Sequence, residues 1–123
     1  MPETNTKTIL IVEDDPVLAN TLRDAFTTEG YLVHLAQDGE EGLKQALELK
    51  PRVIFLDIMM PKMDGLEVLK NLNAQSPDPS RKIYMFTNIS DMDKIAQALS
   101  GGAAGYFIKA QSSLTEILTK VKS

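Results

Sequence analysis

Polar side chains with reactive or metal-binding groups follow four apolar runs of the sequence, each at the point where a run ends. They are Glu13-Asp14-Asp15, Asp57, Thr87 and Lys109. Carboxylates that converge within a few Å repel one another, so they take up protons or recruit a cation. Oxygen ligands without Cys or His favour a hard ion, and Mg²⁺ needs few protein oxygens because it keeps several waters. If the runs are neighbouring strands, these residues predict a magnesium site.

The same residue types suit phosphoryl transfer. A carboxylate beside a metal ion can attack phosphorus, and Asp57 is placed to do so. Lys109 and the Thr87 hydroxyl would then share the charge on the phosphoryl oxygens. Each residue alone is a weak signal, since acid runs often start helices and a Thr or Lys after a strand is often a turn residue or a solvated charge. Their conjunction at four strand ends favours the catalytic interpretation.

Strand and helix signals alternate along the whole chain. The expected strands are residues 9–12, 31–36, 53–56, 83–86 and 106–108. Five strand–helix pairs in strict alternation predict an α/β fold with a parallel sheet, helices on both faces and right-handed crossovers. Ligands bind such sheets at the carboxyl ends of the strands, where the winding reverses. The polar residues above stand at those ends.

Capping residues mark the helices between the strands. Asp15-Pro16 supplies an N-cap and a first-turn proline, and Gly30 stands where a left-handed residue would end that helix. The second helix must stop near Lys50, before Pro51. Ser90 with Asp93, and Ser113 with Glu116, form expected capping boxes for the fourth and fifth helices. Leu114, Ile117, Leu118 and Val121 follow on one face of the last helix.

Composition excludes several classes of protein. Hydrophobic residues at 43% and charged residues at 24% are near globular averages, which predicts one ordinary folded domain. A net charge of -4 repels polyanions, and the basic residues do not cluster in the sequence, so direct contact with nucleic acid is not expected. The absence of cysteine excludes disulfides and thiolate sites. Without a signal sequence or an apolar run of about 18 residues, no membrane contact and a cytoplasmic location are expected.

Four motifs of the chain resemble the response-regulator receiver family. They are Ile-Leu-Ile-Val-Glu-Asp-Asp at 9–15, Leu-Asp-Ile-Met-Met-Pro-Lys-Met-Asp-Gly at 56–65, Thr87, and Gly-Tyr-Phe-Ile-Lys at 105–109. Their order and spacing match the family from residue 8 to about 122. The resemblance implies a flavodoxin-like, doubly wound (βα)5 fold with strand order 2-1-3-4-5, with residues 1–7 as a tail and 8–123 as the receiver domain.

The resemblance also implies a function in phosphorelay signalling. Asp57 would become an aspartyl phosphate, with a sensor histidine kinase or a phosphotransfer protein as donor. The ligands of Mg²⁺ would be Glu13, Asp14, the Asp57 carboxylate and the Met59 backbone carbonyl, with Asp15 as a helix cap. Such a domain is no enzyme beyond catalysing its own phosphorylation and dephosphorylation.

A conformational switch belongs to the same resemblance. Phosphate on Asp57 would draw Thr87 inward, and Tyr106 would turn into the vacated space. This would change the face made by the fourth helix, fifth strand and fifth helix, and so control partner binding. From the residues alone, Tyr106 is a half-buried strand aromatic, for which core packing is the alternative.

Two residues depart from the family pattern. Ala110 follows Lys109 where the family usually has a proline behind a cis bond, and a cis bond before alanine would cost roughly 2.5 to 4 kcal/mol. Asn88 follows Thr87 where a small residue is common. We hypothesise that the Asn88 side chain narrows access to the phosphoryl group and slows its transfer or hydrolysis.

Three rival functions can be weighed. A phosphatase with an Asp nucleophile would want a second aspartate at Met59 and a cap domain. A flavodoxin-like electron carrier would need phosphate-binding donors where Glu13, Asp14 and Asp15 stand. A phosphate-independent receiver that acts as a docking module remains the alternative. The chain is either a stand-alone regulator or a piece of a longer one, its downstream partner or output domain is unknown, and a phosphorylation-dependent homodimer stays open.

Overall fold

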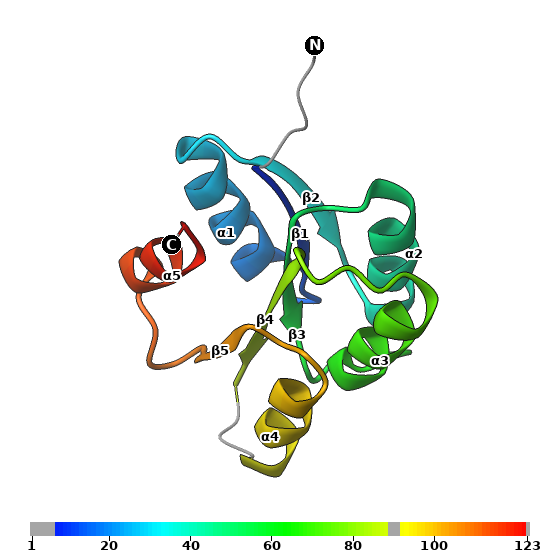
Figure 1. Ribbon diagram of the computed structural model, residues 1–123. Helices are drawn as coiled ribbons and strands as arrows, with labels where there is room; N and C mark the ends of the chain where they lie inside the picture. The colour runs from blue at the N-terminus through cyan, green and yellow to red at the C-terminus, as the bar shows by residue number, and fades with distance from the viewer. Residues whose placement is uncertain (1–6, 89–91, 123) are drawn as a thin grey trace.

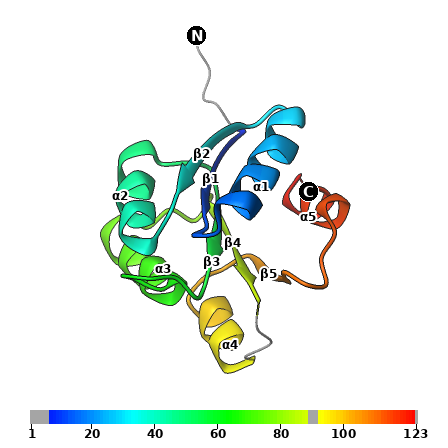
Figure 2. The same cartoon turned by 180° about the vertical axis from the view of Figure 1, so that it is seen from behind.

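The computed structural model describes residues 7–88 and 92–122, which form a five-stranded parallel sheet between two layers of helices (Figures 1 and 2). The strand order is β2-β1-β3-β4-β5. The strands are β1 Thr8–Val12, β2 Leu32–Ala36, β3 Val53–Asp57, β4 Lys82–Thr87 and β5 Gly105–Ile108. The helices are α1 Pro16–Thr28, α2 Gly39–Leu49, α3 Gly65–Gln75, α4 Met92–Ser100 and α5 Leu114–Lys122. The predicted fold class and strand order are confirmed.

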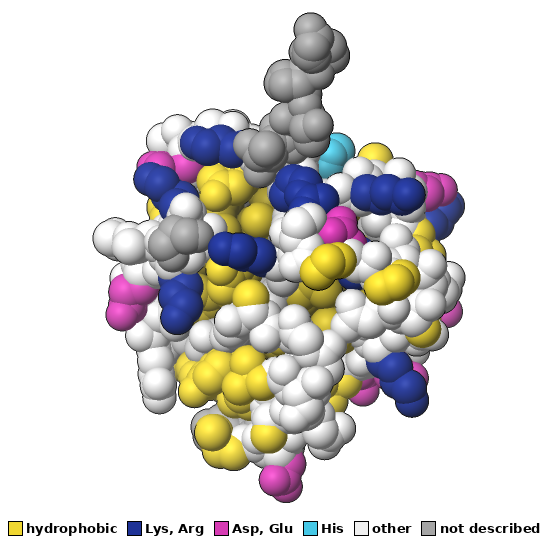
Figure 3. Space-filling view, viewed as in Figure 1, with side chains coloured by type: hydrophobic (Ala, Val, Ile, Leu, Met, Phe, Trp, Pro, Cys, Tyr) yellow, Lys and Arg dark blue, Asp and Glu magenta, His cyan; other side chains and the backbone are white. Residues whose placement is uncertain are grey.

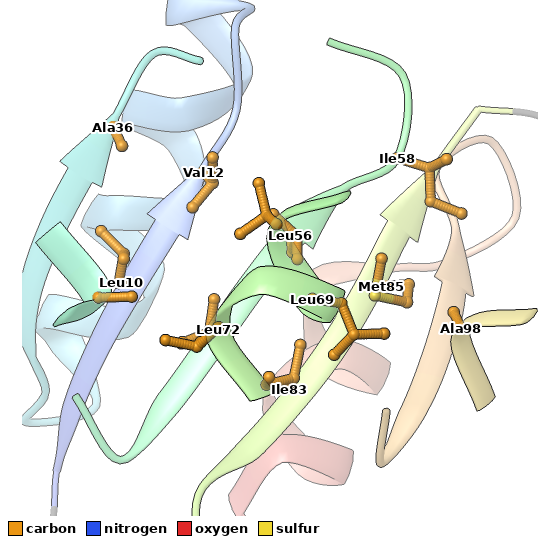
Figure 4. Close-up of a cluster of buried hydrophobic side chains, with 13 residues drawn as sticks. Leu10, Val12, Ala36, Leu56, Ile58, Leu69, Leu72, Ile83, Met85 and Ala98 are labelled. Carbon is orange, nitrogen blue, oxygen red and sulfur yellow. The ribbon is translucent and has the colours of Figure 1, made fainter. Parts of the chain in front are cut away.

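The core has two halves, one on each face of the sheet. Leu10 and Val12 of β1 point to the half covered by α2, α3 and α4, whereas Ile9 and Ile11 point to the half covered by α1 and α5. Figure 4 shows the first half, where Leu10, Leu56 and Met85 from three adjacent strands point to the face covered by α2, α3 and α4. Every residue of β3 is buried, as expected of a central strand with helices on both faces.

The start of α1 and the ends of α1 and α2 lie where the capping residues predict them. The Asp15 carboxylate accepts hydrogen bonds from the backbone N–H groups of the first turn of α1, with Pro16 as the first helical residue. Gly30 follows α1 with φ of +91°, a conformation that favours glycine. Helix α2 ends at Leu49, immediately before Lys50 and Pro51. Residues at the ends of α1 and α2 therefore determine where these helices stop and where the loops to the next strands begin.

The later helices add one cap that sequence reasoning missed. Helix α3 begins with a capping box between Asp64 and Glu67, at an Asp-Gly pair that is also typical of a turn. The box predicted for α5 is confirmed, since the Ser113 N–H donates to Glu116 Oε1 at 2.8 Å and the Glu116 N–H donates to Ser113 Oγ at 3.1 Å. Ser90, predicted to cap α4, lies outside the described residues.

The apolar residues predicted on one face of α5 differ in burial. Ile117 and Val121 are buried against the sheet, as their spacing predicts, but Leu114 is 40% exposed. Leu114 is the first residue of the helix, and the apolar contacts that bury α5 come from its later turns. The exposed leucine leaves apolar surface near the carboxyl end of β5.

The connections place four polar strand ends at one edge of the sheet. β1 and β3 are neighbours although β2 lies between them in sequence, so the winding reverses there. All five strands run in the same direction, and therefore the residues after β1, β3, β4 and β5 emerge at one edge. Among the described helices, none is long and apolar enough to cross a membrane.

Candidate active site

A pocket of about 510 Å³ lies at the carboxyl edge of the sheet and contains most of the predicted site residues. Asp57, the last residue of β3, is 4% exposed, and Glu13, directly after β1, is 2% exposed. Asp14, Met59 and Lys109 also line the pocket. The fold thus brings together residues that are up to 96 positions apart in the sequence.

Lys109 bridges two of the buried carboxylates. Its Nζ lies 2.8 Å from Glu13 Oε1 and 3.0 Å from Asp57 Oδ2. The lysine follows β5, which is separated from β3 by β4, and its Nζ lies 5.3 Å from the ring centroid of Phe86 on β4. The side chain therefore reaches across the end of β4. The peptide bond after Lys109 is not cis, so Ala110 departs from the family pattern in conformation as well as in sequence.

A third carboxylate, that of Asp14, lies beside the two that Lys109 contacts. Carboxylate oxygens of Glu13, Asp14 and Asp57 lie within 4.8 Å of one another. Backbone donors hold two of them, because the Asp15 N–H donates to Glu13 Oε2 at 3.0 Å and the Met59 N–H donates to Asp57 Oδ1 at 3.3 Å. Asp15 itself turns its carboxylate to the start of α1, as predicted for a cap.

Burial and the repulsion between carboxylates raise the pKa values of Glu13 and Asp57. Burial raises the pKa of the Asp57 carboxyl, Lys109 opposes the shift, and the charge of Asp14 adds to it. Burial likewise raises the pKa of Glu13, with Lys109 opposing and the charge of Asp57 adding. Burial alone would lower the pKa of Lys109, but its bonds to Glu13 and Asp57 raise it, so the amine stays charged. An oxygen-only set with more negative than positive charge fits a hard divalent cation such as Mg²⁺.

Thr87 and Tyr106 share one face of the sheet. Thr87 ends β4 and is fully buried, whereas Tyr106 on β5 is 40% exposed. Tyr106 is paired in register with Met85, two residues before Thr87. Because side chains alternate along a strand, Met85, Thr87 and Tyr106 point to the same side. Met85 packs in the core half that contains Ala98 of α4, so this is the face that α4 covers (Figure 4).

Asn88 and Gly65 also lie close to Asp57. Asn88 is exposed and lines the pocket together with Asp57, which is where its proposed effect on access requires it to be. Gly65 was not singled out from the sequence, yet its N–H donates to the Ile58 carbonyl at 2.8 Å and a Cβ on it would lie 2.2 Å from the Asp57 carbonyl oxygen. The Asp-Gly pair after Pro61 signals a turn, but a turn signal does not reveal this close approach.

The chain resembles known proteins along nearly its whole length. Residues 9–122 match the family model of the response regulator receiver domain. The response regulator MprA of Mycolicibacterium vanbaalenii is 35% identical over 115 residues, which are 94% of this chain and 48% of that protein. The transcriptional regulatory protein TrcR of Mycobacterium tuberculosis is 33% identical over 114 residues, 93% of this chain and 43% of that protein. The chain spans about half the length of these relatives.

Solved structures show the same architecture. A CheY-like response regulator receiver domain protein from Methanospirillum hungatei has a TM-score of 0.88 at 29% identity, over 94% of this chain and 90% of that chain. The CheX–CheY–BeF3–Mg²⁺ complex from Borrelia burgdorferi has a TM-score of 0.85 at 27% identity, over 93% of this chain and 85% of that chain. The resemblance predicted from the motifs is confirmed.

Proposed function

Because this chain belongs to the response-regulator receiver family, whose members act in two-component signalling, we propose that Asp57 accepts a phosphoryl group from a phosphohistidine. The donor would be a sensor histidine kinase or a phosphotransfer protein. The observation that carries the proposal is the placement of Asp57, a buried carboxylate in an open pocket, held by the Lys109 ammonium at 3.0 Å.

The transfer requires little more than the residues already in the pocket. A carboxylate oxygen of Asp57 forms a bond to phosphorus, while the bond from phosphorus to the donor nitrogen breaks and its electron pair stays on the histidine. Lys109 already contacts Asp57 Oδ2, so its ammonium can also bind the phosphoryl oxygens and stabilise their negative charge. Thr87 and the Met59 N–H offer further donors at the same strand ends.

Magnesium fits the acidic cluster. We assign Glu13, Asp14, the Asp57 carboxylate and the Met59 carbonyl as the protein groups that would hold it, because three of the four are carboxylates that lie together. When bound, the ion supplies positive charge that offsets repulsion between these carboxylates and the incoming phosphoryl group. The Borrelia burgdorferi neighbour, which is a complex with BeF3 and Mg²⁺, supports this assignment by analogy.

Phosphorylation would be read out on the face formed by α4, β5 and α5. Thr87 and Tyr106 lie on the face of the sheet that α4 covers, so a shift of Thr87 towards Asp57 would change the space beside Tyr106. Met92, Leu99, Tyr106 and Leu114 from these three elements are large apolar side chains that are 40% exposed or more. Added charge at Asp57 would thereby alter a surface suited to protein partners. The downstream partner, including a second copy of the chain, stays a proposal.

A phosphate-independent docking module is the alternative. It would use the same exposed face without any chemistry at Asp57. The burial of Asp57 and its contact with Lys109 argue for the chemical function, since a charged group in this position costs stability and no docking role requires it.

The experiment is to incubate the protein with Mg²⁺ and acetyl phosphate and to measure its intact mass at once. We expect a gain of one phosphoryl group in the unchanged protein, none in Asp57→Asn, and none when Mg²⁺ is chelated. Asp24→Asn, which removes a carboxylate from the exposed side of α1, is the matched control and should gain the group normally. A gain that persists in Asp57→Asn, or no gain in any sample, would contradict the proposal and favour the docking module.

A further inference from the structure

We propose that the first turn of α2 positions the magnesium ligands, because Gly39 and Gly42 let its backbone touch both segments that carry them. The inference rests on the proposed magnesium site and adds two positioning residues, neither of which lines the pocket. Helix α2 follows β2 and lies beside α3 on one face of the sheet (Figures 1 and 2). Its first turn therefore lies at the carboxyl edge, and residues 39 and 42 share one face of the helix.

Gly39 lies against the loop between β3 and α3. A Cβ on Gly39 would overlap the Met63 carbonyl oxygen and would lie 2.6 Å from the Met63 carbonyl carbon. No side chain fits into this space, so the backbone of α2 contacts the backbone of the loop. Met63 comes four residues after Met59, whose carbonyl is assigned to the ion. A side chain at position 39 would therefore push on the loop that carries this ligand.

The same loop is held at two further points. The Gly65 N–H donates to the Ile58 carbonyl at 2.8 Å, which joins the start of α3 to the residue before Met59. The Met63 N–H donates to the Pro61 carbonyl at 2.8 Å and closes a three-residue turn. Because the loop has little freedom between these points, a displacement of Met63 moves the Met59 carbonyl as well.

A charged pair crosses the same contact but adds little to it. The Lys62 Nζ lies 3.6 Å from Asp38 Oδ2, and the lysine side chain is 60% exposed. Solvent weakens exposed pairs of this kind. Asp38 acts as the N-cap of α2, where its carboxylate accepts a hydrogen bond from the Glu41 N–H at 2.9 Å. The close approach at Gly39, and not the ion pair, therefore holds the loop in place.

Gly42 makes the second contact, with the end of β1. A Cβ on Gly42 would lie 2.7 Å from Val12 Cγ1 and 2.9 Å from Val12 Cγ2. Val12 is 1% exposed and directly precedes Glu13. The Glu13 N–H donates to the Ala36 carbonyl at 3.0 Å, so the end of β2 holds the same ligand. The first turn of α2 thus contacts the chain on both sides of the magnesium site, and the spacing between the two sides depends on it.

The test is titration of each variant with Mg²⁺, followed by the chemical shifts of backbone amides, which measures binding of the ion without a phosphoryl donor. We expect Gly39→Ala to weaken Mg²⁺ binding about tenfold, the usual size of effects from residues that support metal ligands. Gly42→Ala should weaken it about threefold, because its Cβ meets the side chain of Val12, which yields more easily than backbone. Should Gly39→Ala not fold, Gly42→Ala decides by the same criterion.

Two control variants separate positioning from loss of stability. Gly101→Ala makes the same substitution at the end of α4, where the Cβ would lie 3.2 Å from the Gln97 carbonyl oxygen, at the opposite end of the sheet. Ile117→Ala opens a cavity in the core half on the other face of the sheet and lowers stability there. Both should bind Mg²⁺ within about twofold of the unchanged protein.

The rate of phosphorylation by acetyl phosphate gives a second readout. In Gly39→Ala the rate should fall at low Mg²⁺ and recover when Mg²⁺ is saturating, because Asp57 and Lys109 are unchanged. Unaltered Mg²⁺ affinity in folded Gly39→Ala, or an equal loss in Ile117→Ala, would overturn the inference while leaving the proposed function intact. If the unchanged protein binds no Mg²⁺, the proposed magnesium site fails and the inference fails with it.

Discussion

The two ends of the sheet gather side chains of opposite charge, and the described residues account for both. At the carboxyl end, the carboxylates of Glu13, Asp14 and Asp57 lie together, and the ammonium of Lys109 contacts two of them. At the amino end, the cations that line a pocket are Lys7, Arg52, Lys82 and Lys122. In Figure 3, Lys and Arg side chains gather in the upper half of the view, where Figure 1 shows the amino ends of the strands. The acidic cluster of the carboxyl end fits a cation, whereas at the amino end Arg52 pairs with Asp78 and Lys122 pairs with Glu29. In a parallel sheet, the residues just before and just after the strands thus decide the chemistry of opposite edges.

The two ends differ in burial as well as in charge. At the carboxyl end, the side chains of Asp57 and Lys109 are 4% and 13% exposed, whereas Arg52 and Lys122 at the amino end are 26% and 48% exposed. Interactions between exposed charges are weakened by solvent and by salt. Substitutions at the carboxyl end should therefore have the larger effects on stability and reactivity, and four of them test that expectation.

The largest effect on stability is expected for Gly65→Ala. The added Cβ would lie 2.2 Å from the Asp57 carbonyl oxygen and 2.9 Å from the Ile58 Cα, so the backbone that carries the proposed phosphoryl acceptor must shift. We expect a loss of about 3 kcal/mol in the free energy of unfolding, measured by urea denaturation. Gly105→Ala is the matched control, because its Cβ would make only ordinary contact with the Tyr84 ring at 3.5 Å. Equal stability of the two variants would contradict the close packing inferred at the carboxyl end.

Lys109→Gln should have the next largest effect, on phosphorylation. The variant leaves Glu13 and Asp57 without their ammonium partner and removes a positive charge that would contact the phosphoryl oxygens. The initial rate of phosphoryl gain from acetyl phosphate should fall about 100-fold. Lys62→Gln, at a side chain that is 60% exposed and pairs with Asp38 at 3.6 Å, should change the rate less than about twofold. Equal rates in both variants would mean that Lys109 does not act on the transferred group.

The carboxyl end could be predicted from the sequence, whereas the amino end could not. Glu13, Asp57 and Lys109 each follow an apolar run directly, and once the strands are known to be parallel these residues must emerge together. The cations of the amino end are separated by loops and helices, and Lys122 arrives from the end of α5, so their meeting depends on tertiary packing. The positions of these cations in the sequence, from 7 to 122, therefore give no sign that they meet.

Contacts that depend on the path of the backbone could not be predicted from the sequence either. The capping box of α5 and the N-cap of α1 are local patterns, and the structure confirms them. The approach of Gly65 to Asp57 and the exposure of Leu114 depend on how loops and helix ends are placed against the sheet. The ion pair from Lys109 to Glu13 is of the same kind, because the lysine must first cross the end of β4.

Asp57→Asn should stabilise the protein, to an extent that depends on pH. Burial raises the pKa of Asp57, so the folded protein binds a proton at this group more readily than the unfolded chain does. Stability of the unchanged protein should therefore increase as the pH falls from above the folded pKa towards the unfolded value of 3.8. Lys109 keeps its contact with Glu13 in the variant. At pH 7 we expect a gain of about 1 kcal/mol, the usual size of single-substitution effects.

Urea denaturation at pH 7 and again near the unfolded pKa measures this dependence. The advantage of Asp57→Asn should shrink at the lower pH, where Asp57 of the unchanged protein is already protonated in the fold. Asp24→Asn provides the comparison for an exposed carboxylate and should stay near the unchanged protein at both pH values. An advantage that grows as the pH falls would contradict the raised pKa.

The smallest effect is expected for Asn88→Ala, which tests how open the carboxyl-end pocket is to the phosphoryl donor. Asn88 is exposed, and its side chain lines the same pocket as Asp57 and Lys109. If it narrows access, alanine should speed phosphoryl gain from acetyl phosphate and loss in water by a few-fold, on the order of the effect of one surface side chain. Thr87 beside it is fully buried, so only the exposed neighbour can be removed without opening the core. Rates of gain and loss that match those of the unchanged protein would show that the approach to Asp57 is limited elsewhere in the pocket.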